Sequence, residues 1–138
     1  MNESFETVAT VIGERVAIIG SRPERVEGRL TEASWARRAR VFSYVESLAR
    51  RSKSTVIVTG DADGADHWAA DAARKYGLQV VVKPADWKKH GKGAGMIRNK
   101  YIVDDADRIV AFLAGDTRGS LNTISLAEKS GKPVEVVR

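Results

Sequence analysis

Two kinds of hydrophobic pattern alternate along the chain. Five short runs are rich in valine and isoleucine, and they are Val16–Ile19, Thr55–Thr59, Leu78–Val82, Arg108–Leu113 and Pro133–Val137. Near-continuous runs of this kind are typical of strands buried on both faces of a parallel sheet. Between them, apolar residues recur every three or four positions, which is the spacing of amphipathic helices.

Four helices are expected from this spacing: one that Ser34 caps and that continues to about residue 51, then 65–76, 94–104 and 120–130. The first carries an apolar stripe that includes Trp35 and Phe42, and its basic residues, Arg37 among them, are expected on a solvated face. Strand–helix alternation of this kind predicts βαβ units. We therefore expect an α/β fold: a Rossmann-like three-layer α/β/α sandwich with a mainly parallel sheet of about five strands. It would span residues 15–138, after an N-terminal extension of residues 1–14.

Composition narrows the class of protein. The chain has 138 residues, which suits one domain, and its lack of cysteine excludes disulfides, thiolate zinc sites and a cysteine nucleophile. The first residues form neither a signal peptide nor a membrane span, so we expect a cytoplasmic protein without a membrane partner. We expect no cofactor and no metal site, because the acidic residues lack the spacing of a known metal-binding motif.

The net charge of +5 comes from one region. Residues 22–53 contain nine basic and four acidic side chains, whereas the rest of the chain is balanced. A basic face of this kind attracts phosphates or nucleic acid, and it is also the ordinary composition of a solvated helix face. Both interpretations stay open at this point.

Candidate chemistry lies in the segments that follow the predicted strands. In open parallel sheets, ligands bind beyond the carboxyl ends of the strands. Glycines, hydroxyls and arginines recur in these segments, where backbone amides and guanidinium groups can hold an anion. The candidate ligand-binding residues are Gly20, Ser21, Arg22, Gly60, Asp61, Gly64, Asp66, Asp86, Trp87, Arg98, Asn99, Gly115, Arg118, Gly119, Ser120 and Thr123.

Each segment also has an ordinary structural interpretation. Asp61, Asp63 or Asp66 can cap the helix that follows the second strand, hold a ribose hydroxyl or bind magnesium, and capping is the commonest of these roles. Trp87 lies among lysines and glycines, where it can stack on a base or fold against the edge of the domain. Arg98 lies one turn into a helix, where a solvated arginine is the plain alternative. The occurrence of such residues after four strands in succession favours one shared site.

These motifs resemble the SLOG superfamily, and within it the YspA, or cpYpsA-related, branch. The similarity covers about residues 15–138 and rests on Gly20-Ser-Arg22, Thr59-Gly-Asp-Ala-Asp-Gly-Ala-Asp66, Pro84-Ala-Asp-Trp87, Gly91-Lys-Gly-Ala-Gly95, Arg98-Asn99, Thr117-Arg-Gly-Ser120 and Thr123. The resemblance implies a Rossmann-like fold and a nucleotide or nucleotide-derived ligand. Lonely Guy phosphoribohydrolases and DprA proteins are other members of this superfamily.

One departure concerns catalysis. Lonely Guy enzymes carry a catalytic glutamate where this chain has Thr123, although Arg98 matches their upstream arginine. Cleavage of an N-glycosidic bond benefits from a carboxylate that stabilises the positive charge of the ribose. Asp116, with Arg98, is the first candidate for that role, and Asp61 and Asp86 are others.

Three functions follow as hypotheses. The first is a module that binds or senses a nucleotide, with the glycines, hydroxyls and Arg22 on phosphate, Asp61 or Asp66 on ribose and Trp87 on the base. The alternatives are an enzyme that cleaves nucleoside 5′-monophosphates to base and ribose 5-phosphate, and a nucleic-acid binder similar to DprA. The resemblance also implies a homodimer, because family members often pair through helices.

Overall fold

The computed structural model describes residues 13–115 and 118–138. A five-stranded sheet contains β1 (Arg15–Gly20), β4 (Val56–Gly60), β5 (Gln79–Lys83), β6 (Arg108–Phe112) and β7 (Val134–Val137). All neighbouring strands pair in parallel, in the order β5-β4-β1-β6-β7. From β1 the chain moves outward through β4 to β5 and then returns to β6 on the other side of β1. The strand order therefore reverses between β1 and β6.

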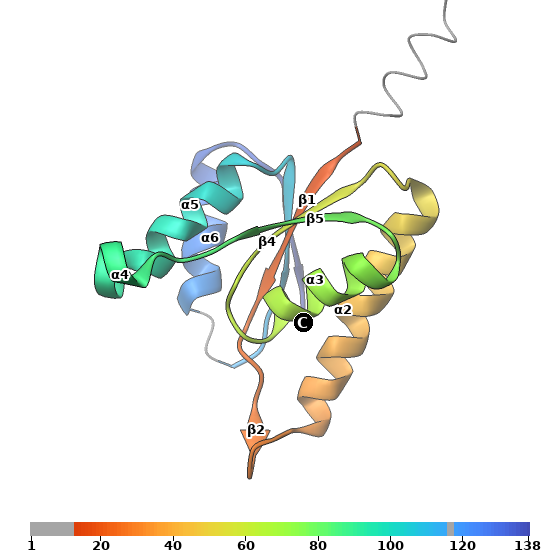
Figure 1. The fold of residues 1–138 in the computed structure, drawn as a ribbon, viewed down its shortest axis with the longest axis horizontal. Coiled ribbons are helices and arrows are strands. Elements are labelled where there is room, and N and C mark those ends of the chain that lie inside the picture. Colours follow the sequence, from red (N-terminus) through yellow and green to blue (C-terminus); the bar gives the residue numbers. More distant parts are fainter. Residues whose placement is uncertain (1–12, 116–117) are drawn as a thin grey trace, which may run out of the picture.

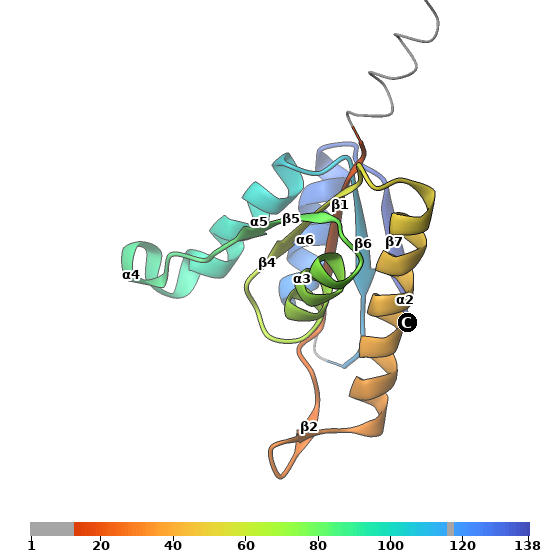
Figure 2. The same cartoon turned by 45° about the vertical axis from the view of Figure 1, so that its right-hand side comes forward.

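Helices cover both faces of the sheet (Figures 1 and 2). The helices α2 (Glu32–Arg51) and α3 (Ala65–Lys75) pack on one face, and α5 (Ala94–Asp104) and α6 (Arg118–Lys129) on the other. Alternate residues of β1 point to opposite faces of the sheet. Val16 and Ile18 belong to the core under α2 and α3, whereas Ala17 and Ile19 belong to the core under α5 and α6. The Rossmann-like sandwich predicted from the sequence is confirmed.

The edge strands differ from the prediction that every strand is buried on both faces. The inner strands β1, β4 and β6 are almost fully buried, but Val82 of β5 and Val136 of β7 are 37% and 43% exposed. The helices of each layer pack over the middle of the sheet, so the outer strands are only partly covered.

The start of α2 also differs from the prediction. The helix is capped by Thr31, whose side-chain oxygen accepts a hydrogen bond from the Ser34 amide at 3.2 Å, and Ser34 itself lies inside the helix. Arg37 is not on a solvated face, because it is only 1% exposed. Trp35, expected within the apolar stripe, is 55% exposed and packs beside Arg38.

Two short strands, a one-turn helix and a 3-10 turn were not expected. Strands β2 (Arg25–Val26) and β3 (Arg29–Leu30) form a hairpin that projects beyond the carboxyl ends of the sheet (Figure 1). A short helix, α4 (Trp87–His90), and a 3-10 turn over Gly91–Gly93 lie between β5 and α5. No helix in the described part of the chain is long and apolar enough to span a bilayer.

Candidate functional site

A cavity of about 510 Å³ opens at the carboxyl ends of β1 and β6, where the strand order reverses. Twelve of the residues predicted for the ligand site line it: Gly20, Ser21, Arg22, Asp66, Trp87, Arg98, Asn99, Gly115, Arg118, Gly119, Ser120 and Thr123. Segments that are as much as a hundred residues apart in the sequence therefore meet around one hollow. Its lining includes four basic and two acidic side chains, so its charge favours an anion.

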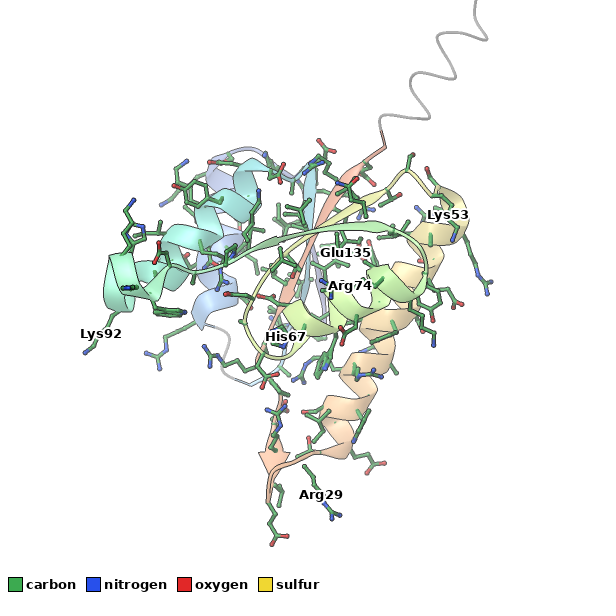
Figure 3. The ribbon with its side chains drawn as sticks, viewed as in Figure 1. Arg29, Lys53, His67, Arg74, Lys92 and Glu135 are labelled. Carbon is green, nitrogen blue, oxygen red and sulfur yellow. The ribbon has the colours of Figure 1, made fainter. Side chains whose placement is uncertain are left out.

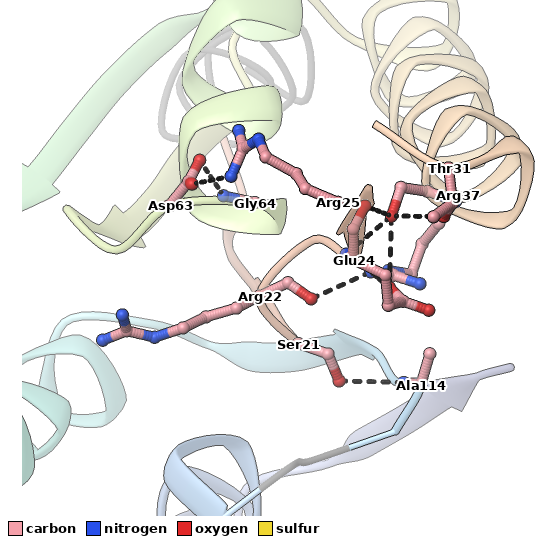
Figure 4. Close-up of polar contacts among 10 residues, drawn as sticks. Ser21, Arg22, Glu24, Arg25, Thr31, Arg37, Asp63, Gly64 and Ala114 are labelled. Atoms are coloured by element: carbon pink, nitrogen blue, oxygen red, sulfur yellow. Dashed lines mark hydrogen bonds and ion pairs between the residues drawn. The ribbon is translucent and has the colours of Figure 1, made fainter. Parts of the chain in front are cut away.

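The loop after β1 forms one wall. Ser21 is buried, and its side-chain oxygen accepts a hydrogen bond from the Ala114 amide at 2.8 Å, which ties this loop to the loop after β6. The Ser21 hydroxyl donates no hydrogen bond to any residue that the structure describes, so it can donate to a ligand. The Arg22 side chain extends away from both loops (Figure 4), and its guanidinium makes no hydrogen bond to any residue that the structure describes.

Arg98 projects from the first turns of α5 and is 9% exposed. Its Nη1 donates to Oδ1 of Asp61 at 2.5 Å, and its Nε donates to Oδ1 of Asn99 at 3.0 Å. Gly60 allows this packing, because a Cβ there would lie 2.7 Å from Nη1 of Arg98 and 2.5 Å from Oδ2 of Asp66. The guanidinium is thus held in place beside two carboxylates.

Asp66 is the buried carboxylate of the cavity and is 5% exposed. Burial raises its pKa from 3.8 to about 6, although the charge of Arg98 and the Ala62 amide, 3.1 Å from Oδ2, both act to lower it. At neutral pH a larger fraction of this carboxyl group is therefore protonated than of an ordinary aspartate.

The first turn of α6 forms the floor. The amino end of a helix carries backbone amides without partners inside the helix, and these favour an anion. Ser120 is 7% exposed, and its hydroxyl has no partner among the residues that the structure describes. Asn99 holds this turn to α5, because its side-chain nitrogen donates to Gly119 O at 3.3 Å and to Oδ1 of Asn122 at 3.0 Å. The Thr123 hydroxyl donates to Gly119 O at 3.3 Å, so it is engaged within the helix.

The remaining wall comes from α4, the 3-10 turn and α5. Trp87 and Met96 are 54% and 60% exposed and present apolar surface to the cavity, and Lys92 brings a positive charge beside them. The sequence prediction included Trp87 but missed Lys92 and Met96. The signal for Lys92 was the lysine-rich segment in which it lies, whereas nothing in the sequence indicates which way Met96 faces.

Four predicted residues lie outside the lining. Gly60 and Asp61 contact Arg98 instead. Gly60 leaves room for the Arg98 guanidinium, and the Asp61 carboxylate forms an ion pair with it. Gly64 begins α3 at a φ of +94°, with no side-chain cap, so the expected capping by an aspartate is wrong. Asp86 instead caps α4, where its Oδ1 accepts from the Lys89 amide at 3.0 Å. Asp116 lies outside the described residues.

Comparison with known proteins agrees with this fold. The chain is 35% identical over 127 residues to the Gene 61 protein of Mycobacterium phage D29, which covers 87% of this chain and 93% of that protein. DNA processing protein A from Helicobacter pylori, solved in a study of its single-stranded DNA binding mode, superposes with a TM-score of 0.68 at 23% identity, over 94% of this chain and 67% of that one.

DprA from Streptococcus pneumoniae superposes with a TM-score of 0.65 at 20% identity, over 95% of this chain, which spans about half of that protein (52%). At these identities the two structures show a shared fold. The model of the YspA, cpYpsA-related SLOG family matches residues 14–90, which is more than half of the sequence. The chain belongs to the YspA, cpYpsA-related SLOG family.

Proposed function

We propose that this protein binds a nucleotide, or a small molecule derived from one, in the cavity at the carboxyl ends of β1 and β6. The observation that carries the proposal is that the lining of this cavity combines two chemically different kinds of group. Arg22 and the first turn of α6 provide donors for a phosphate, whereas Trp87 and Met96 provide an apolar surface on which a base can stack. A nucleotide has both kinds of group.

The ribose would lie between the phosphate and the base. Asp66 lines the cavity, and a carboxylate accepts hydrogen bonds from ribose hydroxyls. Arg98 lies beside Asp66 and offsets part of the negative charge that would otherwise repel a phosphate.

Calorimetric titration with AMP, NAD and ADP-ribose tests the proposal. We expect at least one of them to bind with a dissociation constant below 1 mM, and Arg22→Met to weaken that binding about tenfold, because a hydrogen bond to a charged group contributes about 1.5–3 kcal/mol. Arg29→Met is the matched control, since Arg29 is exposed on the β2–β3 hairpin (Figure 3) and does not line the cavity. Analysis of the same samples for free adenine would detect N-glycosidic cleavage.

Two results would contradict the proposal. The first is the absence of measurable binding at millimolar concentrations of every ligand. The second is an equal loss of affinity in Arg22→Met and Arg29→Met, which would indicate a general charge effect rather than a contact in the cavity.

Single-stranded DNA is the second candidate ligand. It is favoured by the excess of basic residues between positions 22 and 53 and by the structural likeness to DprA proteins, one of which was studied for its single-stranded DNA binding. Titration of a labelled oligothymidine at several salt concentrations distinguishes the two. If the protein binds DNA through its phosphates, the affinity should fall steeply as the salt concentration rises. Arg29→Met and Arg22→Met should then lower the affinity equally.

A further inference from the structure

Arg37 is a buried charge in the middle of α2, only 1% exposed, whereas Arg40 on the same helix is exposed. Its guanidinium lies over the ring of Trp68, 5.7 Å from the centroid. Its Nη2 donates to the backbone oxygen of Arg22 at 3.1 Å and to Oε1 of Glu24 at 2.6 Å (Figure 4). The polar contacts of this side chain in the described structure therefore all go to the loop after β1.

Stability alone does not account for an arginine at this position. Nε of Arg37 is buried and has no hydrogen-bond partner among the described residues. A buried charge with an unpaired donor costs free energy, which an apolar side chain of similar length would avoid. The hydrogen bonds that offset this cost go to Arg22 and Glu24, so they fix the conformation of the loop after β1.

The same loop is held a second time by α2. The backbone amide of Glu24 donates to the Ser34 side-chain oxygen at 2.8 Å, and the Ser34 hydroxyl lies 2.9 Å from the backbone oxygen of Glu24. Both peptide groups of Glu24 are thus fixed to the helix, and Arg37 fixes the carbonyl of Arg22. Fixing these groups restricts the direction in which the Arg22 side chain leaves the backbone.

We propose that Arg37 is a positioning residue for the ligand, which holds the loop so that the guanidinium of Arg22 faces an anionic group in the cavity. This inference rests on the proposed function. Arg37 does not line the cavity, so it acts through Arg22. The effect of Arg37 on ligand affinity should therefore require Arg22. If Arg37 served only the stability of the fold, its effect on affinity would not depend on Arg22.

A double-mutant cycle with AMP and ADP-ribose as probes tests this dependence. We expect Arg37→Met to weaken binding about fivefold and Arg22→Met about tenfold, and the double variant to bind no more than about twofold more weakly than Arg22→Met. Arg40→Met is the matched control, because it removes the same charge from the same helix without touching the loop, and its affinity should stay within about twofold of wild type.

Ser34→Ala releases the same loop without changing the charge, so its cycle with Arg22→Met decides the question if Arg37→Met does not fold. We expect a loss of affinity that disappears in the Arg22→Met background. Additive losses, unchanged binding in both loop variants, or an equal loss in Arg40→Met would overturn the inference and leave the proposed function intact. A wild-type protein that binds none of AMP, NAD and ADP-ribose would overturn both.

Discussion

At the scale of single residues, the side chains that organise the cavity are those with unusual burial. Arg37, Arg98 and Asp66 are all at least nine-tenths buried, although charged side chains are seldom fully buried unless they are paired. The sequence predicted Asp66 as a site residue because it opens the helix after the second strand, and Arg98 because it lies one turn into the third helix and matches the upstream arginine of the Lonely Guy enzymes. It could not predict the burial of Arg37, because its partners, Arg22 and Glu24, reach it only through the tertiary fold.

Asp66 leads to a prediction about pH. Its folded-state pKa of about 6 lies above the ordinary 3.8, so its neutral form is favoured in the folded protein. This contribution to stability is complete below about pH 4 and is lost as the pH rises through 6. Asp66→Asn keeps an oxygen for the Ala62 amide and carries no charge. We therefore expect the free energy of unfolding of Asp66→Asn, relative to wild type, to increase by about 2.5 kcal/mol between pH 4 and pH 8.

Urea unfolding at a series of pH values measures this difference. Asp71→Asn is the control, because Asp71 is exposed on the same helix and its ion pair with Arg74 is a surface contact of 3.8 Å. Its difference from wild type should stay within about 0.5 kcal/mol at every pH. A pH-independent difference for Asp66→Asn would show that the carboxyl group titrates as an ordinary aspartate.

At the scale of elements, the sequence indicates the long ones and misses the short ones. Five strands and four helices carry enough residues for their periodicity to be recognised. The β2–β3 hairpin has two residues in each strand, and its turn places Glu27 and Gly28 at φ values of 50° and 79°. Turns of this type usually contain asparagine or aspartate before glycine, so glutamate gave no signal. The α4 helix is a single turn, too short to show a period.

The start of α3 leads to a second prediction. Gly64 has a φ of +94°, and a Cβ there would lie 2.7 Å from the backbone oxygen of Ser21. Gly64→Ala should therefore lower the free energy of unfolding by at least about 2 kcal/mol, through backbone strain and displacement of the loop after β1. Gly93→Ala is the matched control, because Gly93 has a φ of −83° and nothing within 4 Å of the added carbon.

Chemical denaturation of both variants measures these free energies. Gly93→Ala should lie within about 1 kcal/mol of wild type, on the stabilising side if it differs. Equal stability of the two variants would mean that α3 and the loop after β1 do not pack together as the structure describes.

At the scale of the whole molecule, the site follows from topology. Because all five strands are parallel and the order reverses between β1 and β6, the chain leaves β1 toward α2 on one face and β6 toward α6 on the other, and the hollow lies at this point. The sequence was sufficient to predict which loops gather at this end. It was not sufficient to predict which side chains face inward, since Asp61 and Asp86 are drawn into contacts with Arg98 and with α4.

The position of the ligand is the central claim, and a heteronuclear NMR titration with AMP and ADP-ribose tests it most directly. The account predicts that the backbone amide signals of Ser21, Arg22, Gly119 and Ser120 shift together and saturate with one dissociation constant, while signals from the exposed face of α2 stay unchanged. Shifts confined to α2 or to the β2–β3 hairpin, or no shifts at millimolar ligand, would contradict it.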